Sequence, residues 1–385
     1  MNPLSQLLNL SQPEKLERGL LYTPAEIAQQ PTTWPVTHRL FEELRRDLAV
    51  FLRQAHEERW PIYLIGAGTS DYAGRSVANL LRRRWKCEVQ VVPSTDLLTN
   101  GDDLMVPGLN YLWISFSRSG DSPEGVAALE QALVNSPNVR HVIVSCNQNA
   151  QMAKLAHEHK NCFAAVLSDA VNDRSLAMTS SFTNMILFGQ ELAHLWDGTP
   201  FDKTLECMVQ AAEYLLREGA ELAHNLAQQK YRTACYVGAG SLSATARESA
   251  LKMLELTSGG IQTMYETTLG LRHGPMSALN METLFTLFLS TDPLRRKYDS
   301  DLLNEIRVKQ IVRSIVTVGG MHDASDCSLG CPALEHLDDW YRPAVDVIFG
   351  QLLGLFTSIE LGLKPDSPSP RGIINRVVEK FTIYA

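Results

Sequence analysis

The stretch IYLIGAGTSDYAGRS, residues 62–76, decides the fold. Its apolar start predicts a short buried strand, GAGTS predicts a tight turn, and the remainder continues as a helix. A second stretch, CYVGAGSLSATARES at residues 235–249, repeats this order, and its first glycine lies 172 residues after Gly66. A repeated strand, glycine turn and helix predicts two tandem α/β domains of one fold.

Outward from these stretches, apolar strands alternate with helical segments in both halves of the chain. Because alternating strands and helices form parallel sheets covered on both faces, we expect two mainly parallel sheets flanked by helices on both faces. The expected strands after the first are residues 88–92, 111–116, 139–145 and 162–167, then 234–240, 261–263, 284–290 and 312–318. The expected divisions are an N-terminal segment 1–40, a first domain 41–196, a second domain 197–364 and a tail 365–385.

Composition excludes several classes of protein. The chain has 385 residues, 45% of them apolar, and a net charge of −8, so it is neither disordered nor a general nucleic-acid binder. We expect no signal peptide and no membrane span, because the apolar runs are too short. Seven scattered cysteines indicate reduced thiols in a cytoplasm. One segment offers zinc-type ligands, but we favour a surface loop there: His322, Cys327, Cys331 and His336.

Two loops are rich in small hydrogen-bond donors. GAGTS at residues 66–70 and SFSRSGDS at residues 115–122 each follow an expected strand and precede a helix. Hydroxyl and backbone N–H groups at such a place form a cradle for a phosphate monoester. A dinucleotide site is the competing interpretation, but GAGTSD lacks the third glycine. Asp96 is also a poor ribose anchor, because we expect it deep in a loop after Pro93. The second domain has the charged sequence STDPLRRKYD after its strand at 284–290, so we expect one phosphate site per chain.

The second half carries groups suited to proton transfer. In ARESALKMLELTSGG, residues 246–260, the side chains of Glu248, Lys252 and Glu255 lie within about 60° of one another on a helix. They could be ordinary surface ion pairs, but their apolar flanks favour perturbed pKa values. The following TLGLRHGPMSAL places His273 in a loop, where a histidine can carry a proton.

Together these motifs resemble the sugar isomerase (SIS) family, whose tandem α/β domains bind phosphosugars. The helix and the histidine loop are similar to the isomerase half of glucosamine-6-phosphate synthase. The resemblance implies that Glu255 moves a proton between C1 and C2, that His273 opens the ring from the other subunit of a homodimer, and that Glu248 and Lys252 line the sugar. It also implies a set of phosphate-binding residues: Thr69, Ser70, Ser117, Arg118, Ser119 and Ser122.

Length, the segment AMTSSFT at 177–183 and the tail resemble the bacterial galactosamine-6-phosphate deaminases and tagatose-6-phosphate ketose/aldose isomerases. No glutaminase domain precedes the first SIS unit, and the tail offers only Lys380 where the synthase has a Schiff-base lysine. The resemblance therefore implies conversion of D-galactosamine 6-phosphate to D-tagatose 6-phosphate and ammonia. Such a proton shift requires no metal and no organic cofactor. Hexose 6-phosphate isomerisation without deamination and a non-catalytic phosphosugar sensor stay open as alternatives, as does entry of Lys380 into the site.

Overall fold

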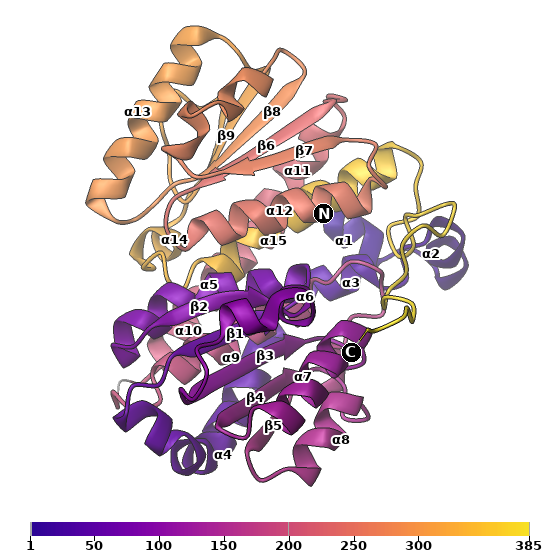
Figure 1. The fold of residues 1–385 in the computed structure, drawn as a ribbon. Helices are drawn as coiled ribbons and strands as arrows, with labels where there is room; N and C mark the ends of the chain where they lie inside the picture. The colour runs from indigo at the N-terminus through magenta and orange to yellow at the C-terminus, as the bar shows by residue number, and fades with distance from the viewer. Residues whose placement is uncertain (1, 199, 385) are drawn as a thin grey trace. The chain divides into compact units, whose positions relative to one another are not determined.

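Two five-stranded sheets form the framework of the protein, whose computed structural model describes residues 2–198 and 200–384. All strand pairs among these residues are parallel, and helices lie on both faces of each sheet (Figure 1), which confirms the predicted fold class. The first sheet contains β1 (Ile62–Gly66), β2 (Val89–Pro93), β3 (Tyr111–Ser117), β4 (Val139–Ser145) and β5 (Cys162–Val166). The second contains β6 (Thr233–Gly238), β7 (Gln262–Glu266), β8 (Thr283–Phe288), β9 (Ser314–Val318) and β10 (Cys327–Leu329).

The two sheets share one topology. The strand orders are β2-β1-β3-β4-β5 and β7-β6-β8-β9-β10, so the second sheet repeats the first strand for strand. In each sheet the second strand of the chain, β2 or β7, pairs with one side of the first strand, β1 or β6. The third strand, β3 or β8, pairs with its other side. Ligands of open parallel sheets bind at the carboxyl ends of the two strands where the order reverses. Those strands are β1 and β3 in the first sheet and β6 and β8 in the second.

The chain divides into two units, one around each sheet. The first-sheet unit comprises Thr33–Asp173, Ser180–Phe201 and Ile374–Ala385, and the second-sheet unit comprises Met1–Thr32, Arg174–Thr179 and Asp202–Ile373. The helices of the first are α4 (Gln30–Glu57), α5 (Thr69–Trp85), α6 (Ser94–Leu104), α7 (Pro123–Asn135), α8 (Gln151–Glu158) and α9 (Ser180–Ala193). Those of the second are α1 (Pro3–Leu8), α2 (Gln12–Arg18), α3 (Thr23–Ala28), α10 (Asp202–Tyr214), α11 (Ala220–Ala227), α12 (Leu242–Leu256), α13 (Pro293–Lys309), α14 (Pro332–His336) and α15 (Pro343–Glu360).

The N-terminal helices α1–α3 lie in the second-sheet unit. Just after α3, at the first residue of α4, the buried Gln30 side chain donates a hydrogen bond to the side-chain amide oxygen of Gln351 on α15, at 2.8 Å. The carboxylate of Asp366 accepts the backbone N–H groups of Leu21 and Thr23, at 2.7 and 2.8 Å. These partners lie more than 300 residues apart in sequence, so local patterns do not reveal them.

Two segments expected as loops have regular structure. The stretch after Pro93 forms α6, and Cys327–Leu329 forms β10, which pairs with β9 in the register Cys327↔Val316. Both are short and carry polar residues, so their hydrophobic periodicity is weak. The expectation of loops at these two places was therefore wrong, while the strands on either side of them lie close to their predicted positions.

Helix α15 forms the centre of the second-sheet unit, against α12. A Cβ added at Gly350 would lie 2.6 Å from the Ser249 Cβ atom, so glycine allows the two helix backbones to approach closely there. By length and composition α15 could cross a membrane, yet 89% of that apolar window is buried within the structure. The close contact with α15 sets the position of α12, which carries the predicted acid–base residues.

Candidate active site

The two predicted phosphate loops lie side by side at the carboxyl edge of the first sheet. Strands β1 and β3 are neighbours, with Ile65 opposite Ser115, and each loop follows one of them directly. The loops lead into the N-termini of α5 and α7, where the positive end of each helix dipole favours an anion. The structure therefore brings both loops to the point where the strand order reverses, which is the usual ligand position in this topology.

Serine side chains shape the second loop while keeping their own hydrogens available. The Ser117 Oγ accepts the N–H of Gly120 at 3.0 Å, and the Ser119 Oγ accepts the N–H of Asp121 at 3.2 Å. Ser122 caps α7, because its Oγ accepts the N–H of Gly125 at 3.3 Å. A hydroxyl that accepts one bond can still donate another, so these groups can donate toward a phosphate oxygen.

Glycine is required at the tip of that loop. Gly120 has φ +62°, a conformation that side chains disfavour, and an added Cβ would lie 2.5 Å from the Ala150 Cβ atom. In the first loop, Thr69 and Ser70 begin α5 and are buried. The backbone of Ser70 lies only 2.4 Å from where a Cβ of Gly66 would stand. Both loops thus fold tightly enough to direct several small donors toward one place.

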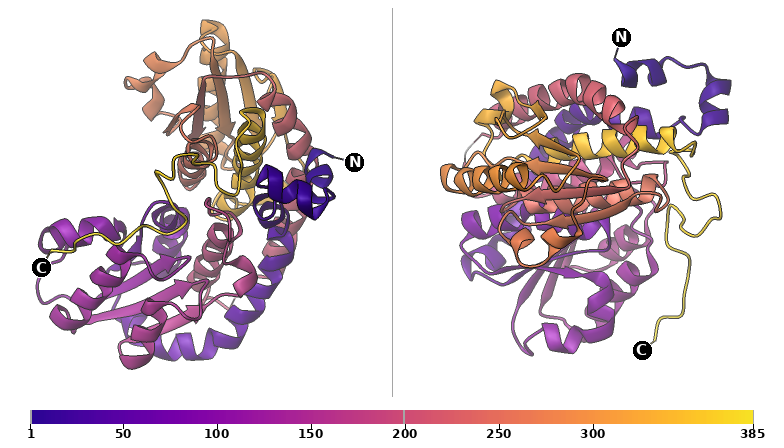
Figure 2. Two further views of the ribbon diagram at one scale, coloured as in Figure 1. Left: turned by 90° about the vertical axis from the view of Figure 1, so that its right-hand side faces the viewer. Right: turned by 90° about the horizontal axis from the view of Figure 1, so that it is seen from above.

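The Arg118 side chain has a partner that the sequence did not reveal. Its guanidinium donates to the main-chain carbonyl of Arg376, in the C-terminal tail that runs along the first-sheet unit (Figure 2). Arg376 in turn donates to the carbonyl of Asp173 at 2.6 Å and to the Asn172 side chain at 2.7 Å. The tail is therefore anchored beside the serine loop, and a phosphate contact by Arg118 stays a prediction. No local pattern in the sequence of the tail indicated this contact.

The corresponding edge of the second sheet holds a carboxylate of the chain itself. After β8, the Ser290 hydroxyl donates to Asp339 at 2.5 Å, the Thr291 N–H donates at 2.8 Å, and Arg295 donates at 3.0 Å. Asp339 is only 4% exposed. Because this carboxylate already occupies the donors that a phosphate would use, the geometry supports the expectation of a single phosphate site per chain. The sequence indicated only that the serine cradle is missing here.

Helix α12 brings together the three charged residues predicted from its sequence. The Lys252 Nζ lies 3.2 Å from the Glu248 Oε1 and forms a close ion pair with the Glu255 carboxylate. Lys252 and Glu248 are fully buried, whereas the Glu255 side chain is 23% exposed. Burial lowers the pKa of Lys252, but the charges of Glu248 and Glu255 and their hydrogen bonds outweigh it and raise that pKa overall. The group is therefore a buried ammonium between two carboxylates, of which only Glu255 reaches the surface.

His273 lies in an exposed loop, after the short turn of helix Gly270–Arg272 and before Gly274, whose φ is +122°. The loop is held by Arg272, whose Nε donates to the Glu305 carboxylate at 2.7 Å. Within the described chain, no hydrogen bond or ion pair joins the His273 imidazole to the α12 residues. The structure thus brings Glu248, Lys252 and Glu255 together and leaves His273 facing outward.

The two histidines among the four zinc-type residues of the C-terminal half have local partners. The His336 Nδ1 contacts the carbonyl of Pro332 at 2.5 Å, and the His322 Nδ1 accepts the N–H of Ala324 at 3.1 Å. Cys327 lies in a strand, and all seven cysteines are free thiols. The close group of metal-type ligands found among the described residues lies elsewhere, on α4 and α9.

Comparison with known proteins was made against this geometry, and no family model matches the chain. A Streptomyces coelicolor protein provisionally named D-galactosamine-6-phosphate deaminase AgaS is 35% identical over 376 residues, which cover 96% of this chain and 97% of that protein. The D-galactosamine-6-phosphate deaminase AgaS of Escherichia coli is 34% identical over 368 residues, covering 94% and 95%. A crystal structure from Clostridium novyi NT, provisionally described as a tagatose-6-phosphate ketose/aldose isomerase, has TM-score 0.93 and 31% identity and covers 98% of each chain.

Two sheets of one topology, donor-rich loops at the strand-order reversal and these neighbours define a tandem SIS protein of the phosphosugar isomerase class. The resemblance inferred from the GAG, SRSGDS and ESALK motifs is thereby confirmed. The chain belongs to the D-galactosamine-6-phosphate deaminase AgaS family.

Proposed function

We propose that this chain is an enzyme that converts D-galactosamine 6-phosphate to D-tagatose 6-phosphate and ammonia. The observation that carries the proposal is the ionised group on α12, in a chain whose AgaS relatives align over nearly its whole length. A buried ammonium held by two carboxylates is costly for a protein that only binds sugar. It suits an enzyme, because Glu255 is an exposed base beside a fixed positive charge.

The proposed mechanism assigns one task to each group. The serine and threonine hydroxyls of the first-sheet unit, with Arg118, hold the 6-phosphate, and His273 moves the proton that opens the ring. Glu255 then removes the C2 proton and returns it to C1, so that an enolamine becomes an imine at C2. Water adds to that imine and ammonia leaves, which produces the ketose. Lys252 is fully buried beside Glu255, so its fixed positive charge favours the negative charge that develops during the proton shift without direct contact with the sugar.

A second candidate function is aldose/ketose isomerisation of hexose 6-phosphates without loss of ammonia. It is favoured by the description of the Clostridium novyi structure as a ketose/aldose isomerase. The same base and the same phosphate cradle would serve, because the 1,2-proton shift is identical when C2 carries a hydroxyl. The two functions differ only in whether water must hydrolyse an imine.

The proposal includes a homodimer with shared sites in a reducing cytoplasm. The free state of all seven cysteines supports the reducing environment. His273 is exposed, and among the described residues no hydrogen bond joins its imidazole to Glu248, Lys252 or Glu255. Both features support a role for His273 in the active site of a partner subunit.

The decisive experiment measures ammonia release from a panel of hexosamine 6-phosphates and ketose formation from the matching hexose 6-phosphates. We expect turnover of galactosamine 6-phosphate with one ammonia per tagatose 6-phosphate. Ketose formation from hexose 6-phosphates with no ammonia from any amino sugar would replace the deaminase by the isomerase. Absence of both products, with saturable phosphosugar binding, would leave only a sensor.

A further inference from the structure

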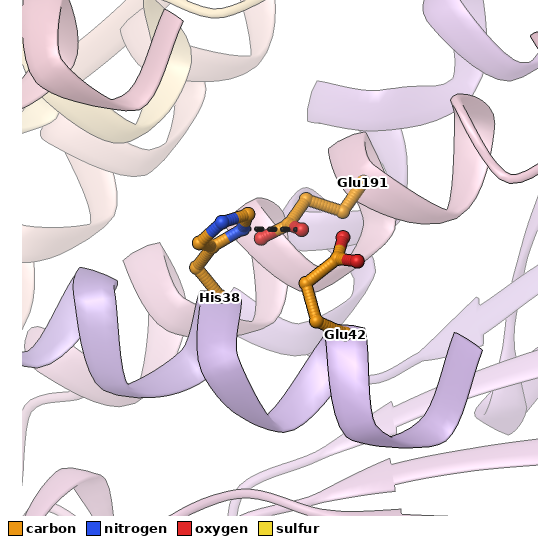
Figure 3. A group of neighbouring side chains, drawn as sticks. All are labelled: His38, Glu42 and Glu191. Carbon is orange, nitrogen blue, oxygen red and sulfur yellow. Dashed lines mark hydrogen bonds and ion pairs between the residues drawn. The ribbon is translucent and has the colours of Figure 1, made fainter. Parts of the chain in front are cut away.

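Three side chains that the proposed mechanism does not use converge between two helices of the first-sheet unit. His38 and Glu42 lie four residues apart on α4 and therefore share a face, and Glu191 approaches them from α9 (Figure 3). The two helices pack against each other there through Phe41 and Phe188, whose rings lie edge to face with centroids 5.3 Å apart. The packing fixes where the three side chains can reach.

The distances suit a single small cation. The His38 Nδ1 lies 2.8 Å from the Glu191 Oε2, and one ligand atom from each of the three residues lies within 4.8 Å of the others. A zinc ion bound at about 2.0–2.2 Å to each ligand needs those atoms roughly 3.3 Å apart. The Glu42 side chain is 44% exposed, so rotation about its own bonds can bring its carboxylate toward the other two ligands.

A second observation comes from the buried carboxylate itself. The Glu191 side chain is fully buried, yet its Oε1 has no hydrogen-bond partner among the described residues, while its Oε2 contacts His38. An unpartnered carboxylate oxygen in a dry interior is costly, and a cation beside it removes that cost.

We propose that His38, Glu42 and Glu191 bind one divalent transition-metal ion of the zinc class per chain, with water completing its coordination. One imidazole nitrogen and two carboxylates are ligands that zinc accepts readily, whereas magnesium prefers oxygen alone. Metal binding replaces the hydrogen bond between His38 and Glu191, and the ion joins α4 to α9. The ion is a structural staple of the first-sheet unit, outside the proposed chemistry on the sugar.

Arg45 competes with the ion for one of the ligands. Its guanidinium forks onto the Glu42 carboxylate, with Nη2 at 2.6 Å from Oε1 and Nε at 3.0 Å from both oxygens. Metal binding requires Glu42 to share or leave this ion pair. We therefore expect Arg45→Gln to raise metal affinity, the opposite of what a merely structural disturbance would do.

The test titrates the chelator-stripped full chain with Zn²⁺ in competition with a chromophoric chelator. We expect one ion per chain, with affinity lowered about 100-fold or more in Glu42→Gln and in Glu191→Gln. Glu42 is half-exposed, so Glu42→Gln should fold even if Glu191→Gln does not. Glu43→Gln is the matched control, since Glu43 is exposed on the same helix and should leave affinity unchanged.

Substitution by Co²⁺ identifies the ligand type. We expect ligand-field absorption without thiolate-to-metal charge transfer, and no change in Cys327→Ser or Cys331→Ser. Stoichiometric binding that persists in Glu42→Gln, thiolate charge transfer, or no binding at one equivalent would each overturn the proposal. Failure of the deaminase assay would leave this metal measurement unaffected.

Discussion

The α12 group combines one buried ammonium with two carboxylates of unequal exposure, and this asymmetry separates their roles. Glu248 is sealed beside Lys252, so it compensates the buried charge. Glu255 also pairs with the Lys252 ammonium group, yet part of its side chain lies at the surface, where a substrate carbon can reach it. The geometry therefore favours Glu255 over Glu248 as the base.

Glu255→Gln keeps the size of the side chain and removes its basicity. We expect turnover to fall about 10²- to 10⁴-fold while phosphosugar binding changes little. The readout is exchange of the substrate C2 hydrogen with solvent deuterium during turnover. Wild-type exchange in Glu255→Gln would transfer the role to Glu248.

The serine loop predicts a different kinetic pattern. Ser117→Ala and Ser119→Ala each remove a donor to phosphate and a bond within the loop, worth about 1.5–3 kcal/mol for a charged partner. We expect KM for the phosphorylated substrate to rise roughly 10- to 100-fold, with little change for the free sugar. Ser136→Ala, at the far end of α7, is the control. An equal loss for galactosamine and its 6-phosphate would remove these serines from the phosphate site.

At the scale of an element, strand β4 contains a buried histidine, His141. Both of its ring nitrogens lack hydrogen-bond partners among the described residues, and the ring of Trp113 on β3 packs edge to face against it, with ring centroids 5.3 Å apart. Burial, with a smaller contribution from the charge of His159, lowers the pKa of His141 to about 3. The strand therefore tolerates this side chain only in its neutral form.

Stability of the first-sheet unit should consequently depend on mild acid. In the unfolded chain His141 binds a proton near pH 6.5, whereas in the folded unit it does not until about pH 3. The contribution of His141 to stability is therefore full above pH 6.5 and falls by about 1.4 kcal/mol per pH unit below it. Glu191 of the same unit contributes in the opposite direction, because burial raises its pKa to about 7. Urea unfolding followed by tryptophan fluorescence at pH 7 and pH 5 should therefore show a loss about 2 kcal/mol larger in the wild-type chain than in His141→Leu. His141→Leu should flatten this slope, and an unchanged slope would assign it to other groups.

At the scale of the whole molecule, the phosphate loops belong to the first-sheet unit and the proposed acid–base residues to the second. If His273 serves the site of a partner subunit, mixed dimers of Glu255→Gln and His273→Ala chains contain one site with both residues intact. We expect such mixtures to regain up to a quarter to a half of wild-type activity, roughly the share of intact sites. Verified heterodimers with no recovered activity would place both residues in one chain's site.

Local sequence patterns determined most of the framework. The alternation of short apolar runs with helices, and the repeated glycine turn at Gly66 and Gly238, are set by interactions over a few residues. The α12 group was predictable for the same reason, because helical spacing alone aligns Glu248, Lys252 and Glu255. The donor-rich loops were predictable because parallel strands end at a common edge.

Tertiary structure alone decided the features that join distant residues. Gln30 bonds Gln351 of α15, Asp339 accepts hydrogen bonds from the donors after β8, and Arg118 bonds the main chain of Arg376, each across a long sequence separation. Likewise His38 and Glu191 are 153 residues apart and meet only because α4 packs on α9. Such pairs have no local signature, since which apolar faces meet depends on the burial and close packing of the whole unit.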